Sequence, residues 1–127
     1  MKQSDCKRIL LVDDEAFTLD LLRLALPPTH YELSYVNSAT AALAAVYDGQ
    51  PDLVLLDVVM PCMSGLDVCR LLKNTPETSH IPVIMLSGLD SKADLAEASR
   101  AGACGYICKP ITITDLQWQI ESHLQCA

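Results

Sequence analysis

Short runs of apolar residues, each closed by a polar or charged side chain, constrain the fold of this chain more than any other feature of its sequence. Three of them are Ile9–Val12, Leu53–Leu56 and Val83–Leu86, and a shorter one is Tyr106–Cys108. Consecutive rather than alternating apolar residues are typical of strands that are buried on both faces. Together with Leu33–Val36, which has a polar interruption, these runs predict five strands.

Segments with helical spacing separate the predicted strands. In the first segment, Phe17, Leu21 and Leu24 recur every three or four residues, which predicts one apolar helix face. Ser38 and Thr114 are the expected N-caps of the second and the last helix. Strand and helix therefore alternate five times with short connections. This order predicts an α/β fold in which helices cover both faces of a parallel sheet.

Length and charge exclude some classes of function. The chain has 127 residues, with 16 Asp and Glu against 9 Lys and Arg, and its formal charge is −7. This length fits one domain over residues 1–127, with a core that needs no disulfide or structural metal. The basic residues form no stripe that would displace counterions from phosphates, so we expect no direct binding to nucleic acid.

The cysteines fit neither a disulfide framework nor a zinc site, because no C-x-x-C pair occurs and no histidine completes a four-ligand set. The apolar run near the N-terminus is too short for a signal peptide or a membrane span. We therefore expect a cytoplasmic protein with reduced thiols and no membrane association. The cysteines are Cys6, Cys62, Cys69, Cys104, Cys108 and Cys126.

Polar side chains close four of the predicted strands. Asp13 and Asp14 follow the first strand, Asp57 the third, Ser87 the fourth and Lys109 the fifth. In a parallel sheet the carboxyl ends of the strands lie at one edge, so these side chains should meet there. Three carboxylates at one partly buried place repel one another unless a cation intervenes. Oxygen ligands without His or Cys favour Mg²⁺.

The chemistry of this group of side chains suits phosphoryl transfer. A magnesium ion, the Lys109 ammonium and the Ser87 hydroxyl supply the charge neutralisation and placement that a phosphoryl group needs. No Ser or Cys nucleophile is paired with a base, so a carboxylate is the expected acceptor.

Four segments carry a resemblance to a known family. LLVDDE, LVLLDVVMPCMSG, VIMLSG and GYICKP, in this order and at these separations, resemble the receiver domain of two-component response regulators. The resemblance implies a doubly wound (βα)5 domain of the flavodoxin-like type, with strand order 2-1-3-4-5. It implies a phosphorylation-dependent signalling switch that catalyses only its own phosphorylation and slow dephosphorylation. The implied partners are a sensor histidine kinase or histidine phosphotransfer protein, and a downstream effector protein or appended output domain.

The resemblance also implies a role for each acidic residue of the site. Asp57 would be the phosphoacceptor. Asp14 and Asp57 would bind Mg²⁺ directly together with the backbone carbonyl of Val59, and Asp13 would act mainly through a coordinated water.

The remaining roles concern the phosphorylated state. Ser87 would hydrogen-bond a phosphoryl oxygen after transfer, and Lys109 would pair with that group and with Asp57. The Lys109–Pro110 peptide is often cis in the family. Tyr106 would be the switch aromatic, which turns inward when Ser87 moves toward the phosphate.

Two apolar residues bear on how long the phosphorylated state lasts. Val59 and Leu89 stand two residues after Asp57 and Ser87, where side chains of similar domains line the path of water to the phosphoryl group. Neither can orient an attacking water, so we expect slow hydrolysis of the aspartyl phosphate.

Simpler interpretations exist for each residue taken alone. Asp13 and Asp14 could favour a helix N-terminus, Ser87 could be a helix cap, and Lys109 could be a solvated loop residue. Tyr106 could be a half-buried aromatic on an edge strand. Only the joint placement of these residues favours a site.

Two other functions compete with the signalling switch. One is a magnesium-dependent phosphatase with an aspartate nucleophile, of the haloacid-dehalogenase-like kind. That family places a second Asp two residues after the first, where this chain has Val59. The other is a phosphorylation-independent interaction module with a degenerate site, which the presence of all five expected groups disfavours.

Overall fold

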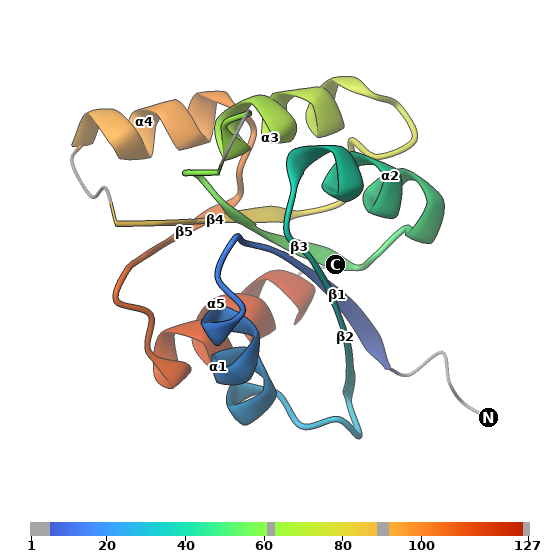
Figure 1. Cartoon of the computed structure of the whole chain (residues 1–127), viewed down its shortest axis with the longest axis vertical. Helices are drawn as coiled ribbons and strands as arrows, with labels where there is room; N and C mark the ends of the chain where they lie inside the picture. The colour runs from blue at the N-terminus through green and yellow to red at the C-terminus, as the bar shows by residue number, and fades with distance from the viewer. Residues whose placement is uncertain (1–5, 61–62, 89–91, 126–127) are drawn as a thin grey trace.

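Strands and helices alternate along the chain in the computed structural model, which describes residues 6–60, 63–88 and 92–125 (Figure 1). The strands are β1 (Lys7–Val12), β2 (Tyr31–Val36), β3 (Leu53–Asp57), β4 (Val83–Ser87) and β5 (Gly105–Cys108). The helices are α1 (Phe17–Ala25), α2 (Ala39–Gly49), α3 (Gly65–Asn74), α4 (Lys92–Arg100) and α5 (Ile113–Gln125). The five strands predicted from the apolar runs are confirmed. β1, β2 and β5 begin one or two residues earlier than predicted, and β3 and β4 include the polar residue that closes each run.

The strands form one sheet in the order β2-β1-β3-β4-β5, and every neighbouring pair is parallel. Helices α2, α3 and α4 cover one face of the sheet, and α1 and α5 cover the other (Figure 1). The strand order and the doubly wound α/β fold are therefore confirmed. Because the chain runs from β1 outward to β2 and then returns to β3, the order reverses between β1 and β3, where such folds place their functional sites.

The continuous apolar runs reflect two cores, one on each face of the sheet. In β3, Val54 and Leu56 belong to the core shared with α2 and α3, whereas Leu53 and Leu55 belong to the core shared with α1 and α5. All four side chains have 0% of their surface exposed. Each such side chain contributes roughly 1.5–3 kcal/mol of hydrophobic stabilisation, so the central strand is a rigid support for the residue that ends it.

The apolar face predicted for α1 is wrong. Phe17 and Leu24 have 67% and 71% of their surface exposed, and the buried side chains of this helix are Thr18, Leu22 and Ala25. The period of the pattern is correct, but the face that contacts the sheet is displaced by one residue. Because leucines occur on several sides of this helix, periodicity cannot tell which side packs against the core.

One of the two predicted helix caps is confirmed. The Ser38 hydroxyl accepts a hydrogen bond from the Ala41 amide at 3.2 Å at the start of α2. Thr114 is not the cap of α5, because the helix begins at Ile113 and the Thr112 hydroxyl accepts from the Asp115 amide at 3.1 Å. The cap of α5 is therefore Thr112, two residues before the predicted Thr114.

Four cysteines of the described chain, Cys6, Cys69, Cys104 and Cys108, are free thiols, and Cys62 and Cys126 lie outside the described residues. Burial raises the pKa of the Cys69 thiol to about 11, partly offset by Lys73. Cys69 is therefore a neutral packing residue. Among the described helices, none combines the length and the apolar character that crossing a membrane requires.

Candidate functional site

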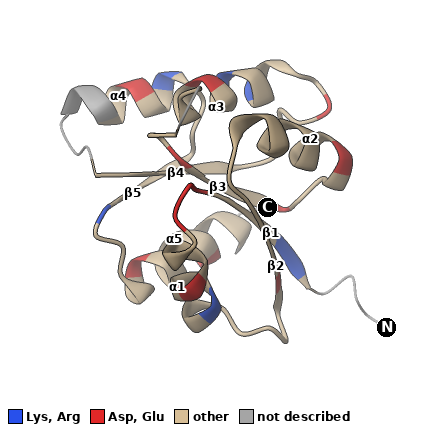
Figure 2. Ribbon diagram, viewed as in Figure 1, with Lys and Arg blue, Asp and Glu red and all other residues tan. Residues whose placement is uncertain are grey.

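The polar residues that close the strands lie at the carboxyl edge of the sheet. Figure 2 shows acidic segments after β1 and at the end of β3 on the same edge as the basic residue that follows β5. The strand register sets this arrangement, since Val12 pairs with Leu56, and Asp57 pairs with Leu86, one residue before Ser87. Ser87 is buried at the end of β4, beside Asp57.

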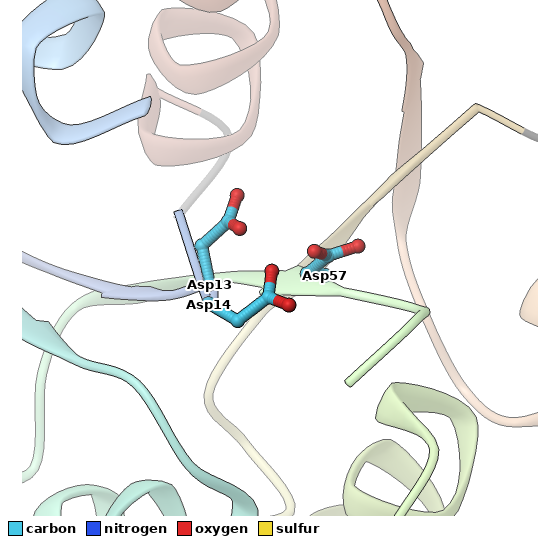
Figure 3. Close-up of side chains that lie close together, drawn as sticks. All are labelled: Asp13, Asp14 and Asp57. Atoms are coloured by element: carbon cyan, nitrogen blue, oxygen red, sulfur yellow. The ribbon is translucent and has the colours of Figure 1, made fainter. Parts of the chain in front are cut away.

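Three carboxylates meet at the reversal of strand order. Asp13, Asp14 and Asp57 each offer one oxygen, and these oxygens lie within 4.8 Å of one another (Figure 3). Asp13 and Asp57 are buried, while Asp14 is exposed. The donor set is made only of oxygen and carries up to three negative charges, which fits a hard divalent cation such as Mg²⁺.

Lys109 supplies a positive charge to this cluster. Its Nζ lies 3.4 Å from Asp57 Oδ2, 3.7 Å from Asp13 Oδ2 and 3.9 Å from Glu15 Oε1. Partial burial alone would lower the pKa of Lys109, but the neighbouring carboxylates outweigh it and raise this pKa above its ordinary value. The lysine is therefore a permanent cation. Its amide donates to the Ser87 carbonyl at 2.7 Å, and the Lys109–Pro110 peptide is cis, as the resemblance implies.

The pKa of the Asp57 carboxyl group is raised well above its ordinary value. Burial and the charge of Asp13 raise its pKa from 3.8 to about 6, while Lys109 and the hydrogen bond from the Val59 amide lower it in part. The Val59 amide donates to Asp57 Oδ1 at 3.2 Å. One ammonium is thus too little to neutralise the cluster, and a second cation would complete the compensation.

The chain after β3 turns closely around Asp57. A Cβ at position 65 would overlap the backbone carbonyl of Asp57, so only glycine fits there. The Gly65 amide donates to the Val58 carbonyl at 2.8 Å, and the Ser64 hydroxyl accepts from the Leu66 amide at 3.1 Å to cap α3. The Ser64–Gly65 pair therefore holds the start of α3 against the end of β3.

Two residues near Asp13 were not anticipated from the sequence. The Thr18 hydroxyl donates to Asp13 Oδ2 at 2.9 Å, and the Tyr35 hydroxyl donates to the backbone carbonyl of Asp13 at 2.9 Å. Tyr35 belongs to the edge strand β2, and Thr18 lies in the first turn of α1. A single sequence contains no spacing rule that would have identified either contact.

The remaining predicted residues lie around β5 and the rim of the site. Tyr106 is half-buried and lines a pocket of about 180 Å³ together with Leu95, Ala98 and Ser99 of α4. At the rim, the apolar side chain of Val59 is 63% exposed, and Leu89 lies outside the described residues.

Comparison with known proteins agrees with this arrangement. Residues 9–121 match the family described as the response regulator receiver domain. The chain is 42% identical over 104 residues to "Response regulator PleD" of Caulobacter vibrioides, an alignment that covers 82% of this chain and 23% of PleD. It is 35% identical over 119 residues to "DNA-binding response regulator MtrA" of Mycobacterium tuberculosis, covering 94% of this chain and 51% of MtrA.

A solved structure extends the similarity to three dimensions. The signal receiver domain of a signal transduction histidine kinase from Syntrophus aciditrophicus superposes with a TM-score of 0.85 at 31% identity. The match covers 96% of this chain and 92% of that chain. By contrast, the chain spans only about a quarter to a half of the length of PleD and MtrA, so the comparison with them concerns one part of each.

Proposed function

This chain belongs to the response regulator receiver domain family of two-component systems, and from that premise we propose that it is a switch phosphorylated on Asp57. The observation that supports this most is the meeting of a buried acceptor carboxylate with two further carboxylates and an ammonium. We infer that residues 1–127 act as one receiver domain. The phosphoryl donor would be a phosphohistidine on a sensor histidine kinase or a histidine phosphotransfer protein.

The proposed metal site uses oxygen ligands from both strand ends. Asp14 and Asp57 would bind Mg²⁺ directly with the carbonyl of Val59, and Asp13 would act through a coordinated water. The exposure of Asp14 supports its role as a direct ligand, and the hydrogen bonds already made by both oxygens of Asp13 support an indirect one. When bound, the ion would neutralise charge on the acceptor and on the phosphoryl oxygens.

The transfer step follows from the position of Asp57. One carboxylate oxygen would attack phosphorus in line, a bond from oxygen to phosphorus would form, and the bond from phosphorus to the donor imidazole nitrogen would break. Lys109, 3.4 Å from Asp57 Oδ2, would bind the arriving phosphoryl group by its ammonium. Ser87 would donate its hydroxyl to a phosphoryl oxygen after transfer. The chain would thus catalyse only its own phosphorylation and dephosphorylation.

The output would pass through the face formed by α4, β5 and α5. Movement of Ser87 toward the phosphate would make room for Tyr106 to turn inward and change this face. The half-buried position of Tyr106 and the pocket between it and α4 support two alternative rotamers. A shift of a few kcal/mol between two conformations is enough to switch the binding of an effector protein or an appended output domain.

We also propose slow hydrolysis of the aspartyl phosphate. Val59, whose amide donates to Asp57 Oδ1, has an exposed apolar side chain with no group that could orient water. The same argument for Leu89 rests on its sequence position alone. Loss of phosphate from wild type and from the double variant Val59→Asn with Leu89→Glu tests the idea, because equal rates would exclude it.

Direct labelling tests the function. Wild-type protein incubated with Mg²⁺ and ³²P-labelled acetyl phosphate should take up label that is stable to acid and lost at alkaline pH, as expected of an acyl phosphate. Asp57→Asn should take up none, while Asp67→Asn, which changes an exposed carboxylate on α3, should behave as wild type. Label that persists in Asp57→Asn would show that another residue is the acceptor. The haloacid-dehalogenase-like alternative requires turnover of added phosphate esters, which this protein should not support.

A further inference from the structure

The hydroxyl of Thr18 is buried and directed at the first carboxylate of the site. Thr18 and Asp13 have 3% and 0% of their surface exposed, and the hydroxyl donates to Asp13 Oδ2 at 2.9 Å. Thr18 lies in the first turn of α1, where a threonine commonly bonds to its own helix backbone. Here the hydroxyl instead joins the helix to the residue that follows β1. The same orientation of α1 leaves the side chain of Phe17 exposed.

Asp13 Oδ2 is shared between two donors. It accepts the Thr18 hydroxyl and also lies 3.7 Å from Lys109 Nζ. The other oxygen, Asp13 Oδ1, accepts the Glu15 amide at 3.0 Å. The carboxylate therefore cannot rotate without breaking a hydrogen bond. Its attraction for the Lys109 ammonium is weakened because the Thr18 hydroxyl donates to the same oxygen.

Lys109 is held between two carboxylates that compete for it. Its Nζ is 3.4 Å from Asp57 Oδ2 and 3.7 Å from Asp13 Oδ2, so the two attractions are nearly balanced. The ammonium must stay close to Asp57 to meet a phosphoryl group there. Any change that strengthens Asp13 as an acceptor would draw it away from Asp57.

We propose that Thr18 is a positioning residue for phosphoryl transfer, which occupies Asp13 Oδ2 and thereby leaves the Lys109 ammonium on the Asp57 side. This inference rests on the proposed function of Asp57 as acceptor. Thr18 itself touches neither the phosphoryl group nor the proposed direct metal ligands Asp14 and Asp57, and it acts through Asp13 and Lys109.

Thr18→Val is the decisive variant, because valine keeps the shape of the side chain and removes the hydroxyl. The rate of phosphorylation by acetyl phosphate at saturating Mg²⁺ should fall about tenfold, the change that corresponds to loss of one hydrogen bond to a charged group. The affinity for Mg²⁺, measured by titration calorimetry without a phosphoryl donor, should stay the same or become tighter. Without the hydroxyl donor the negative charge on Asp13 Oδ2 is less well compensated, which favours a cation.

Three further variants separate positioning from mere support of the fold. Thr18→Ser keeps the hydroxyl and should restore the wild-type rate, and Thr18→Cys, with its weak thiol donor, should lie between serine and valine. Thr78→Val is the matched control. Thr78 is 1% exposed and its hydroxyl donates to the Leu72 carbonyl at 2.6 Å, but it precedes β4, at the opposite end of that strand from Ser87. This variant should lower thermal stability and leave the phosphorylation rate unchanged.

The outcomes distinguish this inference from the proposed function. A wild-type protein that takes up no label would overturn the proposed function. If wild type is labelled and Thr18→Val is labelled within about twofold of its rate, only the role of Thr18 is overturned. The role is also overturned if Thr18→Val loses Mg²⁺ affinity in parallel with rate and Thr18→Ser does not restore either. Thr18→Cys and Thr18→Ser decide the matter should Thr18→Val fail to fold.

Discussion

Asp13 and Asp57 stand at the ends of the neighbouring strands β1 and β3 and share one ammonium, yet their surroundings differ. Both oxygens of Asp13 accept hydrogen bonds from α1 or the loop before it, and its backbone carbonyl accepts the Tyr35 hydroxyl. The carboxylate of Asp57 accepts from the Val59 amide and lies 3.4 Å from Lys109 Nζ, and its pKa is raised to about 6, by burial first and then by Asp13.

The difference indicates a division of labour between two buried carboxylates. Hydrogen bonds from α1 and from the loop before it hold both oxygens of Asp13 in one orientation. Asp57 lies closer to the ammonium, at 3.4 Å from Lys109 Nζ against 3.7 Å for Asp13. The carboxylate that ends β3 is thus the one suited to react, and the other is suited to hold the site together.

Replacing each carboxylate by its amide should have the largest effect on phosphorylation, and it tests the difference between Asp13 and Asp57 directly. Asp57→Asn should abolish phosphorylation by acetyl phosphate, because an amide is not a nucleophile. Asp13→Asn should keep a measurable rate, reduced by about 10–100-fold through loss of one charge near the metal and Lys109. Gel-shift assay of the phosphorylated species measures both. Equal loss in the two variants would contradict the division of labour.

Removal of the shared ammonium should have the next largest effect. Lys109→Met should slow phosphorylation by about 10²-fold, as expected for loss of a positioned cation in a transfer site. It should also strengthen the dependence of thermal stability on Mg²⁺, because the carboxylates then lack their only neighbouring cation among the described residues. Lys7→Met, at an exposed position of β1, is the control. The comparison is measured by labelling and by thermal melting with and without Mg²⁺.

The raised pKa of Asp57 predicts the sign of a pH effect on the metal-free protein. Its pKa is about 6 in the folded protein against an ordinary value of 3.8, so the folded state binds this proton more tightly than the unfolded state. Stability from this group is therefore present at low pH and is lost as pH rises from about 4 through about 6. Thermal melting with a chelator at pH 5 and pH 7 tests this, with Asp57→Asn as the reference.

In that experiment, wild type should lose more stability than Asp57→Asn between the two pH values. At pH 7 the metal-free variant should be the more stable protein by about 1 kcal/mol, or several degrees in melting temperature. Saturating Mg²⁺ should reverse this order, because only wild type then gains the full binding energy. If the melting temperatures of the two proteins change equally with pH, the raised pKa of Asp57 is not the source of the pH dependence.

The smallest effect is expected at the backbone anchor of Asp13. Tyr35→Phe removes a hydroxyl that donates to the Asp13 carbonyl, which should cost about 1 kcal/mol of stability and change the phosphorylation rate by less than about threefold. Tyr47→Phe, on an exposed tyrosine of α2, should change neither. Chemical denaturation and the labelling assay measure the two quantities. If Tyr35→Phe slows phosphorylation more than Thr18→Val does, the hydrogen bond to the backbone carbonyl of Asp13 is the contact that positions this residue.

Much of the site was visible in the sequence because strands buried on both faces must be apolar throughout. The charged residues that end them therefore stand out, as Asp57 does after Leu53–Leu56. Parallel strands bring such ends to one edge, which is why Asp13, Asp14 and Lys109 could be grouped with Asp57 before the fold was known. Their catalytic and metal-binding roles remain predictions.

The sequence alone thus determined the order of the elements, the two-sided burial of the sheet and the edge where charge gathers, because these depend on local periodicity and on the geometry of parallel strands. Only the tertiary structure decided which side of α1 faces the sheet and that Thr18 and Tyr35 hold Asp13. The rotation of a helix about its axis and a hydrogen bond between distant segments are settled by packing against neighbours. The spacing of residues within one segment of the sequence therefore does not predict them.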